Sequence, residues 1–130
     1  MTDAVTLTIP RGRPFYGVAR LVVGGLAIRL DLSYEHLEDL QLAVESVLSN
    51  DAYAAGDDVT VELSVRDSLL EVFVGPVDGG SLRSDLERED EGIGLRRLLS
   101  AVVEDVSVEQ RNGSEWVRLE KRIGPGGAAA

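Results

Sequence analysis

The clearest architectural pattern in this 130-residue sequence is DVSVEQRNGSEWVRLEKR, residues 105–122. Apolar and polar side chains alternate on both sides of Asn112-Gly113, the dipeptide that most favours the tight turn of a β-hairpin. The stretch VTVELSV, residues 59–65, alternates in the same way and is followed, after the turn RDS, by LLEVFV, which ends at Val74. Two such hairpins predict a sheet that is largely antiparallel.

The sequence before these hairpins predicts one strand and one helix. VTLTIP, residues 5–10, alternates as a strand with one buried face does. Residues 15–29 carry apolar side chains three and four positions apart, as an amphipathic helix does. Gly24 and Gly25 each weaken this helix by roughly 1 kcal/mol relative to alanine, unless something packs closely against them.

A second helix, a long loop and a short third helix complete the prediction. Ser33 is a suitable N-cap for a helix from about residue 34 to about residue 53, and Gly56 is a suitable C-cap. Residues 75–91 are rich in glycine, serine and acidic side chains without periodicity, which predicts a long loop. GIGLRRLLSAVV, residues 92–103, predicts the short helix.

The predicted order is therefore β-α-α-β-β-loop-α-β-β. Because the sheet is mostly antiparallel, the helices must cover one of its faces, which gives a two-layer α/β sandwich. We expect a single domain over residues 1–123 and a disordered tail over residues 124–130, which read GPGGAAA.

Composition limits the range of functions. The formal net charge of −10 argues against direct nucleic-acid binding and suits a basic or mixed-charge protein partner, although acidity also simply aids solubility. There is no cysteine, and His36 is the only histidine, which argues against thiolate or multi-histidine metal sites. No signal peptide or membrane span is apparent, so we expect a soluble cytoplasmic protein.

Three segments together resemble a known family. They are FYGVARLV (residues 15–22), SYEHLEDLQLAV (residues 33–44) and GIGL (residues 92–95), which opens the last helix. In this order they are similar to the anti-sigma-factor kinases of the histidine-kinase-like (GHKL) ATPase family, which have a Bergerat-type nucleotide fold. The resemblance covers roughly residues 5–122 and implies ATP and magnesium as cofactors.

In that family the second helix carries Glu-x-x-x-Asn, where the glutamate is the base and the asparagine holds magnesium on the phosphates. The resemblance places Asn50 at the magnesium position and Ser46 at the base position. Glu45 is about 100° around the helix and cannot simply replace the base. A serine hydroxyl does not accept a proton at neutral pH as a carboxylate does, so we expect no catalytic residue here. The alternative is that Ser46 is only a small residue packed near the sheet.

The family's next motif is Asp-x-Gly-x-Gly, whose aspartate contacts adenine. In one alignment Pro76 stands where that aspartate belongs. In the other, Asp78 is the adenine contact, Gly80 the first glycine, and Leu82 stands at the final glycine. The alternative interpretation is that GPVDGG, residues 75–80, is a plain cluster of turn residues.

The third motif implies that Gly92 and Gly94 place a helix N-terminus against the nucleotide phosphates. The residue before them is Glu91, where the family often has a basic one. It ends the acidic run DLEREDE, residues 85–91, and carboxylates beside a phosphate site repel ATP. The alternative is that this run is a solvated loop.

The resemblance implies two competing functions. The first is an anti-sigma regulatory factor that sequesters an RNA polymerase sigma factor and is displaced by an anti-anti-sigma (STAS) protein in a stress response. Arg13 and Arg20 are then the partner-binding residues, since arginine pairs well with carboxylates; alternatively, Arg20 is an ordinary solvent-facing charge. The second is an active ATP-dependent serine kinase that phosphorylates the anti-anti-sigma protein. A stand-alone ATP sensor is a third possibility, and the family also implies a homodimer through residues 5–10 or the first helix.

Overall fold

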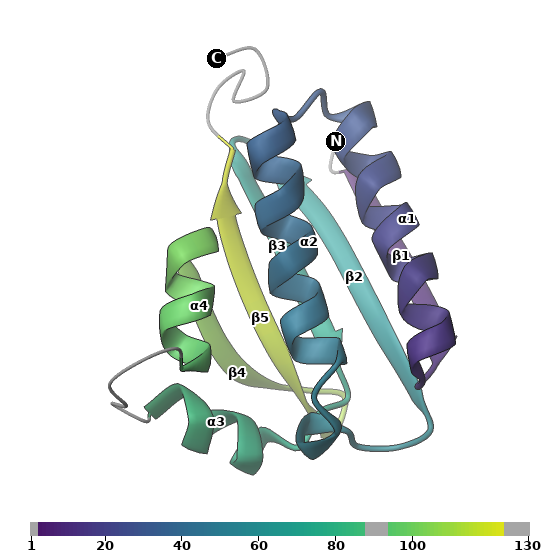
Figure 1. Cartoon of the computed structure of the whole chain (residues 1–130), viewed down its shortest axis with the longest axis vertical. Helices are drawn as coiled ribbons and strands as arrows, with labels where there is room; N and C mark the ends of the chain where they lie inside the picture. Colours follow the sequence, from purple (N-terminus) through teal and green to yellow (C-terminus); the bar gives the residue numbers. More distant parts are fainter. Residues whose placement is uncertain (1–2, 88–93, 124–130) are drawn as a thin grey trace.

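A computed structural model describes residues 3–87 and 94–123 of the chain. These residues form a five-stranded sheet with four α-helices on one of its faces (Figure 1). The predicted fold class, a two-layer α/β sandwich with an antiparallel sheet, is confirmed. The single domain over residues 1–123 stays a prediction, and the predicted tail at 124–130 lies outside the described residues.

The sheet consists of two hairpins and one edge strand. Its order is β1-β2-β3-β5-β4, and every neighbouring pair is antiparallel. Asn112 and Gly113 have positive φ angles of 53° and 80°, as the predicted two-residue turn requires. The strands are β1 (Asp3–Pro10), β2 (Asp58–Arg66), β3 (Leu69–Gly75), β4 (Asp105–Arg111) and β5 (Ser114–Arg122).

The alternating pattern of the strands directs apolar side chains toward the helices. Six of these inward side chains on β2 and β3 are at most 1% exposed, and burying each one stabilises the fold by roughly 1.5–3 kcal/mol. Those on the two central strands are Val59, Val61, Leu63, Leu70, Val72 and Val74.

The opposite face of the sheet carries charged and aromatic side chains. Within the described residues no helix lies over it (Figure 1). Arg118 bonds Glu71 there at 2.6 Å, and the Arg111 guanidinium stacks 4.0 Å from the ring centroid of Phe73 and 5.0 Å from that of Trp116. These contacts hold the polar face together without helical cover.

Two long helices, α1 (Arg13–Arg29) and α2 (Tyr34–Leu48), lie side by side on the sheet. Ser33 is the N-cap of α2, as predicted, because its hydroxyl accepts a 3.2 Å hydrogen bond from the backbone N–H of His36. The buried side of α2 is Leu40, Ala43, Val44, Val47 and Leu48.

The predicted end of the second helix is wrong. The α-helix stops at Leu48 and a short 3₁₀ helix, η1 (Asp51–Tyr53), follows it. Asn50 has extended backbone angles, and its side chain accepts a 2.9 Å hydrogen bond from the Ala52 N–H, which caps the new turn in place of further α-helix. Gly56, with a φ of 96°, therefore lies before β2 and does not cap α2.

The predicted loop over residues 75–91 is also partly wrong, because it contains helix α3 (Gly79–Glu87). Leu82 and Leu86, one turn apart, are 0% and 5% exposed and anchor this helix on the core. Two apolar side chains in so short a segment give too little periodicity to indicate a helix. The last helix, α4 (Leu95–Val102), lies inside its predicted range.

A buried lysine joins the two layers. Lys121 on β5 is 5% exposed, and its ammonium donates a 2.7 Å hydrogen bond to the carbonyl of Val102 at the end of α4. The same Nζ lies 3.4 Å from a carboxylate oxygen of Asp39 on α2. One cation therefore connects the sheet to two helices.

No helix among the described residues has the length and apolar character to cross a membrane.

Candidate functional site

The proposed base position holds no carboxylate. Ser46 lies in the last turns of α2, half-buried, and its hydroxyl donates a 2.7 Å hydrogen bond to the Leu42 carbonyl one turn earlier. Asn50 follows the end of the helix, with φ −95° and ψ 110°, and caps η1. Because Asn50 is not helical, the four-residue helical spacing assumed for this pair does not apply.

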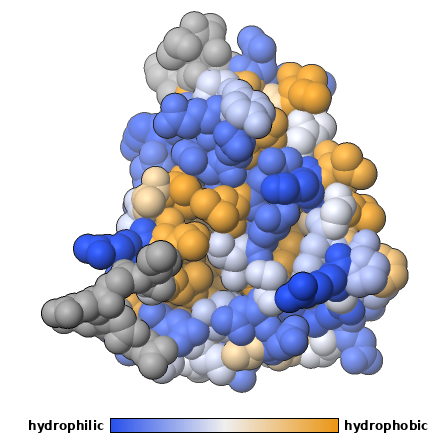
Figure 2. All heavy atoms as spheres, viewed as in Figure 1, coloured by the Kyte–Doolittle hydropathy of each residue, from blue (hydrophilic) through white to orange (hydrophobic). Residues whose placement is uncertain are grey.

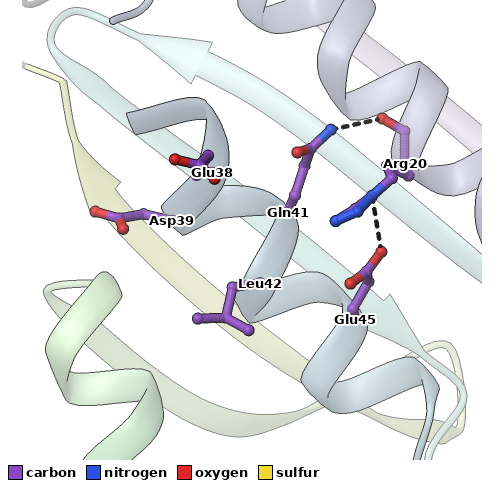
Figure 3. A pocket seen from close by; sticks show the side chains of 6 residues that line it. All are labelled: Arg20, Glu38, Asp39, Gln41, Leu42 and Glu45. Carbon is purple, nitrogen blue, oxygen red and sulfur yellow. Dashed lines mark hydrogen bonds and ion pairs between the residues drawn. The ribbon is translucent and has the colours of Figure 1, made fainter. Parts of the chain in front are cut away.

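Glu45, the carboxylate next to the base position, faces α1 instead. Its Oε1 lies 3.0 Å from Nε of Arg20, and the Gln41 amide donates a 3.2 Å hydrogen bond to the Arg20 carbonyl (Figure 3). These contacts tie α2 to α1 across a shallow groove with a volume of about 280 Å³. The groove is lined by Arg20, Glu38, Asp39, Gln41, Leu42 and Glu45.

Asp78 has a structural contact in this arrangement. It is exposed at the start of α3, where its Oδ1 accepts a 3.2 Å hydrogen bond from the Ser81 N–H, as an N-cap does. Gly80 lies exposed in the first turn of the helix, and Leu82, at the final glycine position of the motif, is fully buried. Pro76, the other candidate for the aspartate position, accepts a hydrogen bond from the Arg11 guanidinium through its carbonyl.

Tyr53 and Asp85, which the sequence analysis did not single out, connect η1 to α3. Tyr53 is 2% exposed, and its hydroxyl donates a 2.5 Å hydrogen bond to Asp85. Burial, and then the bond to Asp85, raise the pKa of the Tyr53 hydroxyl above its ordinary value. The Tyr53 carbonyl also accepts a 2.9 Å bond from the Asp78 N–H, so the segments carrying Asn50 and Asp78 meet. In the sequence, the place of Tyr53 at the predicted end of the second helix gives no indication of this contact.

The glycines of the third motif are partly described. Gly94 is the N-cap residue of α4, and its carbonyl accepts a 3.0 Å hydrogen bond from the Leu98 N–H. Gly92 and Glu91 lie outside the described residues. Arg96 in the first turn of α4 donates a 2.5 Å hydrogen bond to the Leu86 carbonyl, which holds α3 beside α4.

The two predicted partner-binding arginines lie on α1 in different surroundings. Arg20 is paired with Glu45, with 48% of its side chain exposed. Arg13 is exposed at the first position of the helix and lines a polar cavity of about 310 Å³ between α1 and the end of α2. Arg11, Tyr16, Ser49 and Asp51 also line it.

The arrangement is a poor fit for a magnesium–nucleotide complex. The Asn50 amide oxygen accepts from the backbone, Ser46 bonds its own helix, and Asp78 caps α3. Among residues 3–87 and 94–123, no group of three or more histidine or acidic side chains is placed to hold a metal ion. The polar atoms of these three side chains therefore make hydrogen bonds that stabilise the fold.

Comparison with known proteins gives relatives named RsbW. No family model matches the chain. The serine-protein kinase RsbW of Halalkalibacterium halodurans is 27% identical across 85% of this chain and 78% of that protein. RsbW of Listeria monocytogenes serotype 4a is 36% identical across 72% of this chain, which spans only 61% of the Listeria protein.

A solved structure supports the fold. The crystal structure of the RsbU and RsbW domains of Rv1364c from Mycobacterium tuberculosis matches 92% of this chain and 32% of that one, with a TM-score of 0.67 and 14% identity. At that identity the likeness concerns the fold alone. The sequence relatives and this fold together make the chain RsbW-like: it is similar in sequence to serine-protein kinases of that name, and its fold is that of an RsbW domain.

Proposed function

We propose that this protein is an anti-sigma regulatory factor that binds and sequesters an RNA polymerase sigma factor and is released by an anti-anti-sigma (STAS) protein. The observation that carries the proposal is the contact of Glu45 with Arg20 at 3.0 Å. Glu45, the carboxylate next to the base position in the sequence, is turned toward α1 and forms an ion pair with Arg20. Ser46 itself carries no group that is basic at neutral pH. Binding another protein needs a surface and no base.

Two groups on α1 support a docking role. Arg13 is exposed, and no hydrogen bond or ion pair holds it among the described residues. Arg20 is held only by a solvent-exposed ion pair, a type worth about 0.2–1 kcal/mol, so a partner carboxylate can replace Glu45 at little cost. Both arginines are therefore available for bidentate pairing with an acidic partner.

Binding to sigma factors without nucleotide tests the proposal. Purified protein is titrated by calorimetry with each sigma factor of the source organism, in the absence of ATP. We expect one of them to bind, and Arg13→Ala to weaken that binding tenfold or more, about 1.4 kcal/mol. Arg66→Ala, an exposed arginine on β2, is the matched control and should change affinity less than twofold. Absence of binding to every sigma factor contradicts the proposal.

The alternative function is an active ATP-dependent serine kinase, which the names of the relatives favour. A ligand at 100 times its dissociation constant adds about 2.7 kcal/mol of stability, so millimolar Mg-ATP should raise the melting temperature of a kinase clearly. We expect no such rise in the native protein. Transfer of labelled phosphate to an anti-anti-sigma protein, lost in Asn50→Ala or Glu45→Gln, establishes the kinase instead.

A designed gain of function sharpens this test. Ser46→Glu restores a carboxylate at the base position, and Ser46→Gln is its uncharged control of the same shape. If only the base is missing, Ser46→Glu gains phosphotransfer and Ser46→Gln does not. If ATP binding is also prevented because the Asn50 and Asp78 side chains cap η1 and α3, as we expect, neither variant gains phosphotransfer.

What the resemblance implies beyond this stays a prediction: the homodimer through β1 or α1, and the roles of Asn50, Asp78, Gly80, Gly92 and Gly94. The melting test with Mg-ATP decides whether ATP and magnesium, the implied cofactors, bind at all.

A further inference from the structure

The polar cavity of about 310 Å³ lies where α1 begins and α2 ends, beside the short helix η1. Figure 2 shows hydrophilic residues on this part of the surface, toward the lower right of the view. The full lining is Arg11, Gly12, Arg13, Tyr16, Leu48, Ser49, Asp51 and Ala54. The described residues that the family motifs place at a nucleotide are absent from it: Asn50, Asp78, Gly80 and Gly94. A different set of side chains therefore forms this cavity.

Arg11 brings a positive charge to the cavity without a carboxylate partner. Its guanidinium donates a hydrogen bond to the carbonyl of Pro76, and its Nε is buried and makes no hydrogen bond. Burial lowers the pKa of Arg11, a shift that the nearby Tyr16 opposes only in part. Charges removed from water are normally paired in proteins, yet within the described residues no ion pair reaches Arg11. The missing counter-charge indicates an anion that comes from outside the chain.

A second guanidinium and two hydroxyls surround the same space. Arg13 is exposed and has no hydrogen bond or ion pair in the described part of the chain. The hydroxyls of Tyr16 and Ser49 make no hydrogen bond there either, so both can donate to a ligand. Gly12 begins α1 without a side-chain cap, and the positive end of the helix dipole adds to the charge. Asp51 is the single carboxylate of the lining.

The charge around the cavity matches a phosphate group better than a carboxylate. The two guanidinium groups and the helix N-terminus, set against Asp51, leave a net charge of roughly +1.5. A phosphate ester carries about −1.5 to −2 at pH 7, whereas a carboxylate carries a single negative charge. Arginine also pairs with phosphate through two parallel hydrogen bonds. The Tyr16 ring and Ala54 add apolar lining, which suits an organic phosphate with a small apolar part.

We propose that this cavity binds a phosphate group, free or on a small molecule, between the guanidinium groups of Arg11 and Arg13. The Pro76 carbonyl holds the first guanidinium in place, and the exposed Arg13 side chain turns toward the ligand. The hydroxyls of Tyr16 and Ser49 donate to the remaining phosphate oxygens. The inference does not depend on the proposed function, and the two share only Arg13.

Two aromatic anions of similar size, phenyl phosphate and benzoate, test the preference for phosphate. Each is titrated at constant ionic strength into isotope-labelled full-length protein and followed by NMR, with inorganic phosphate as a third titrant. We expect phenyl phosphate to shift the backbone amides of Gly12, Arg13 and Ser49 saturably and to bind at least about fivefold more tightly than benzoate. Two results support the site and distinguish its ligand: tighter binding of phenyl phosphate than of inorganic phosphate indicates an organic ester, and equal binding indicates the free ion.

Substitutions with opposite expected effects locate the site. Arg13→Gln removes an exposed positive charge and should weaken phenyl phosphate at least about fivefold, whereas Asp51→Asn removes the repulsive carboxylate and should tighten it about threefold. Arg66→Gln on β2 and Asp31→Asn, beyond the far end of α1, make the same charge changes away from the cavity. These two controls should change binding less than about twofold. Arg11→Gln should abolish saturable binding, with thermal unfolding to verify that the variant is folded.

Three results overturn the proposal: no saturable shift at millimolar phenyl phosphate, equal binding of phenyl phosphate and benzoate, or equal weakening by Arg13→Gln and Arg66→Gln. The last result would show a general attraction of anions to positive charge and no site. The proposed function is judged separately, by the sigma-factor titration in phosphate-free buffer, which succeeds or fails whatever these anions do.

Discussion

Among the described side chains, Tyr53 has a strongly raised pKa, and its titration gives a testable pH dependence. Its pKa in the folded protein lies above the ordinary value of about 10, so folding protects it from ionisation. The stabilisation is complete below pH 10 and is lost as pH rises above it, because the unfolded chain releases the proton first. We expect the unfolding free energy of the native protein to fall more steeply above pH 10 than that of Tyr53→Phe. The extra slope is up to about 1.4 kcal/mol per pH unit.

The measurement is chemical denaturation of both proteins between pH 8 and pH 10.5. At pH 8 the substitution should also lower stability by about 1–2 kcal/mol, because the bond to the half-buried Asp85 is lost. Tyr34→Phe, at a side chain 73% exposed, is the control and should follow the native curve. Parallel slopes for native protein and Tyr53→Phe would show that the hydroxyl is not protected.

A second residue-level prediction concerns Asp78. As the N-cap of α3 it should contribute about 0.5–2 kcal/mol, so Asp78→Ala should destabilise by that amount and Asp78→Asn by much less. Urea unfolding measures both. A change in Mg-ATP affinity without a change in stability would restore Asp78 as the adenine contact.

Residue roles were the least predictable part of the site. The family resemblance implies that Ser46 stands at the position of a base, and helix geometry turns Glu45 away from that position. The Arg20 partner of Glu45 comes from another helix, so nothing local to Glu45 encodes this contact. Tyr53 and Asp85 are likewise 32 residues apart, and their bond depends on a helix that the sequence pattern did not indicate.

At the level of elements, glycines in ordered segments divide into two kinds. A Cβ at Gly25 meets nothing, whereas a Cβ at Gly75 of β3 would lie 2.4 Å from the Trp116 ring. Gly25→Ala should therefore raise the unfolding free energy by up to about 1 kcal/mol, and Gly75→Ala should lower it. Thermal unfolding of the two variants checks the opposite signs. Destabilisation by Gly25→Ala would mean that α1 has a packing neighbour within the chain.

Elements with strong local signals were predicted well from the sequence. The two hairpins follow from alternation and from Asn112-Gly113, and Ser33 correctly starts α2. The end of α2 was wrong because Asn50 forms a cap that competes with helix, and α3 was missed because burial of only two leucines, Leu82 and Leu86, holds it. Helices fixed by a few tertiary contacts leave little periodicity to detect.

For the molecule as a whole, the Lys121 ammonium is the group that ties the two layers together. Asp39→Asn leaves the Lys121 cation, at a site 5% exposed, with neutral acceptors only, and we expect a loss of about 1–3 kcal/mol, moderated by the partial exposure of Asp39. Lys121→Met replaces the charge by an apolar chain of similar length and should change stability by less than about 1 kcal/mol. Urea denaturation ranks the two, and a larger loss in Lys121→Met would contradict this account.

The outermost position of β1 in the sheet has a consequence for handling the protein. Residues 4–10 of this strand, AVTLTIP, include no charged side chain, while the opposite border strand, β4, is rich in charge. The charge of Asp3 and the ring of Pro10 protect only the two ends of β1, and an uncharged stretch between them is a template for intermolecular strand addition. Concentrated solutions of the protein should therefore form fibrils through pairing of β1 strands, which thioflavin fluorescence detects. Thr6→Lys should prevent this increase in fluorescence.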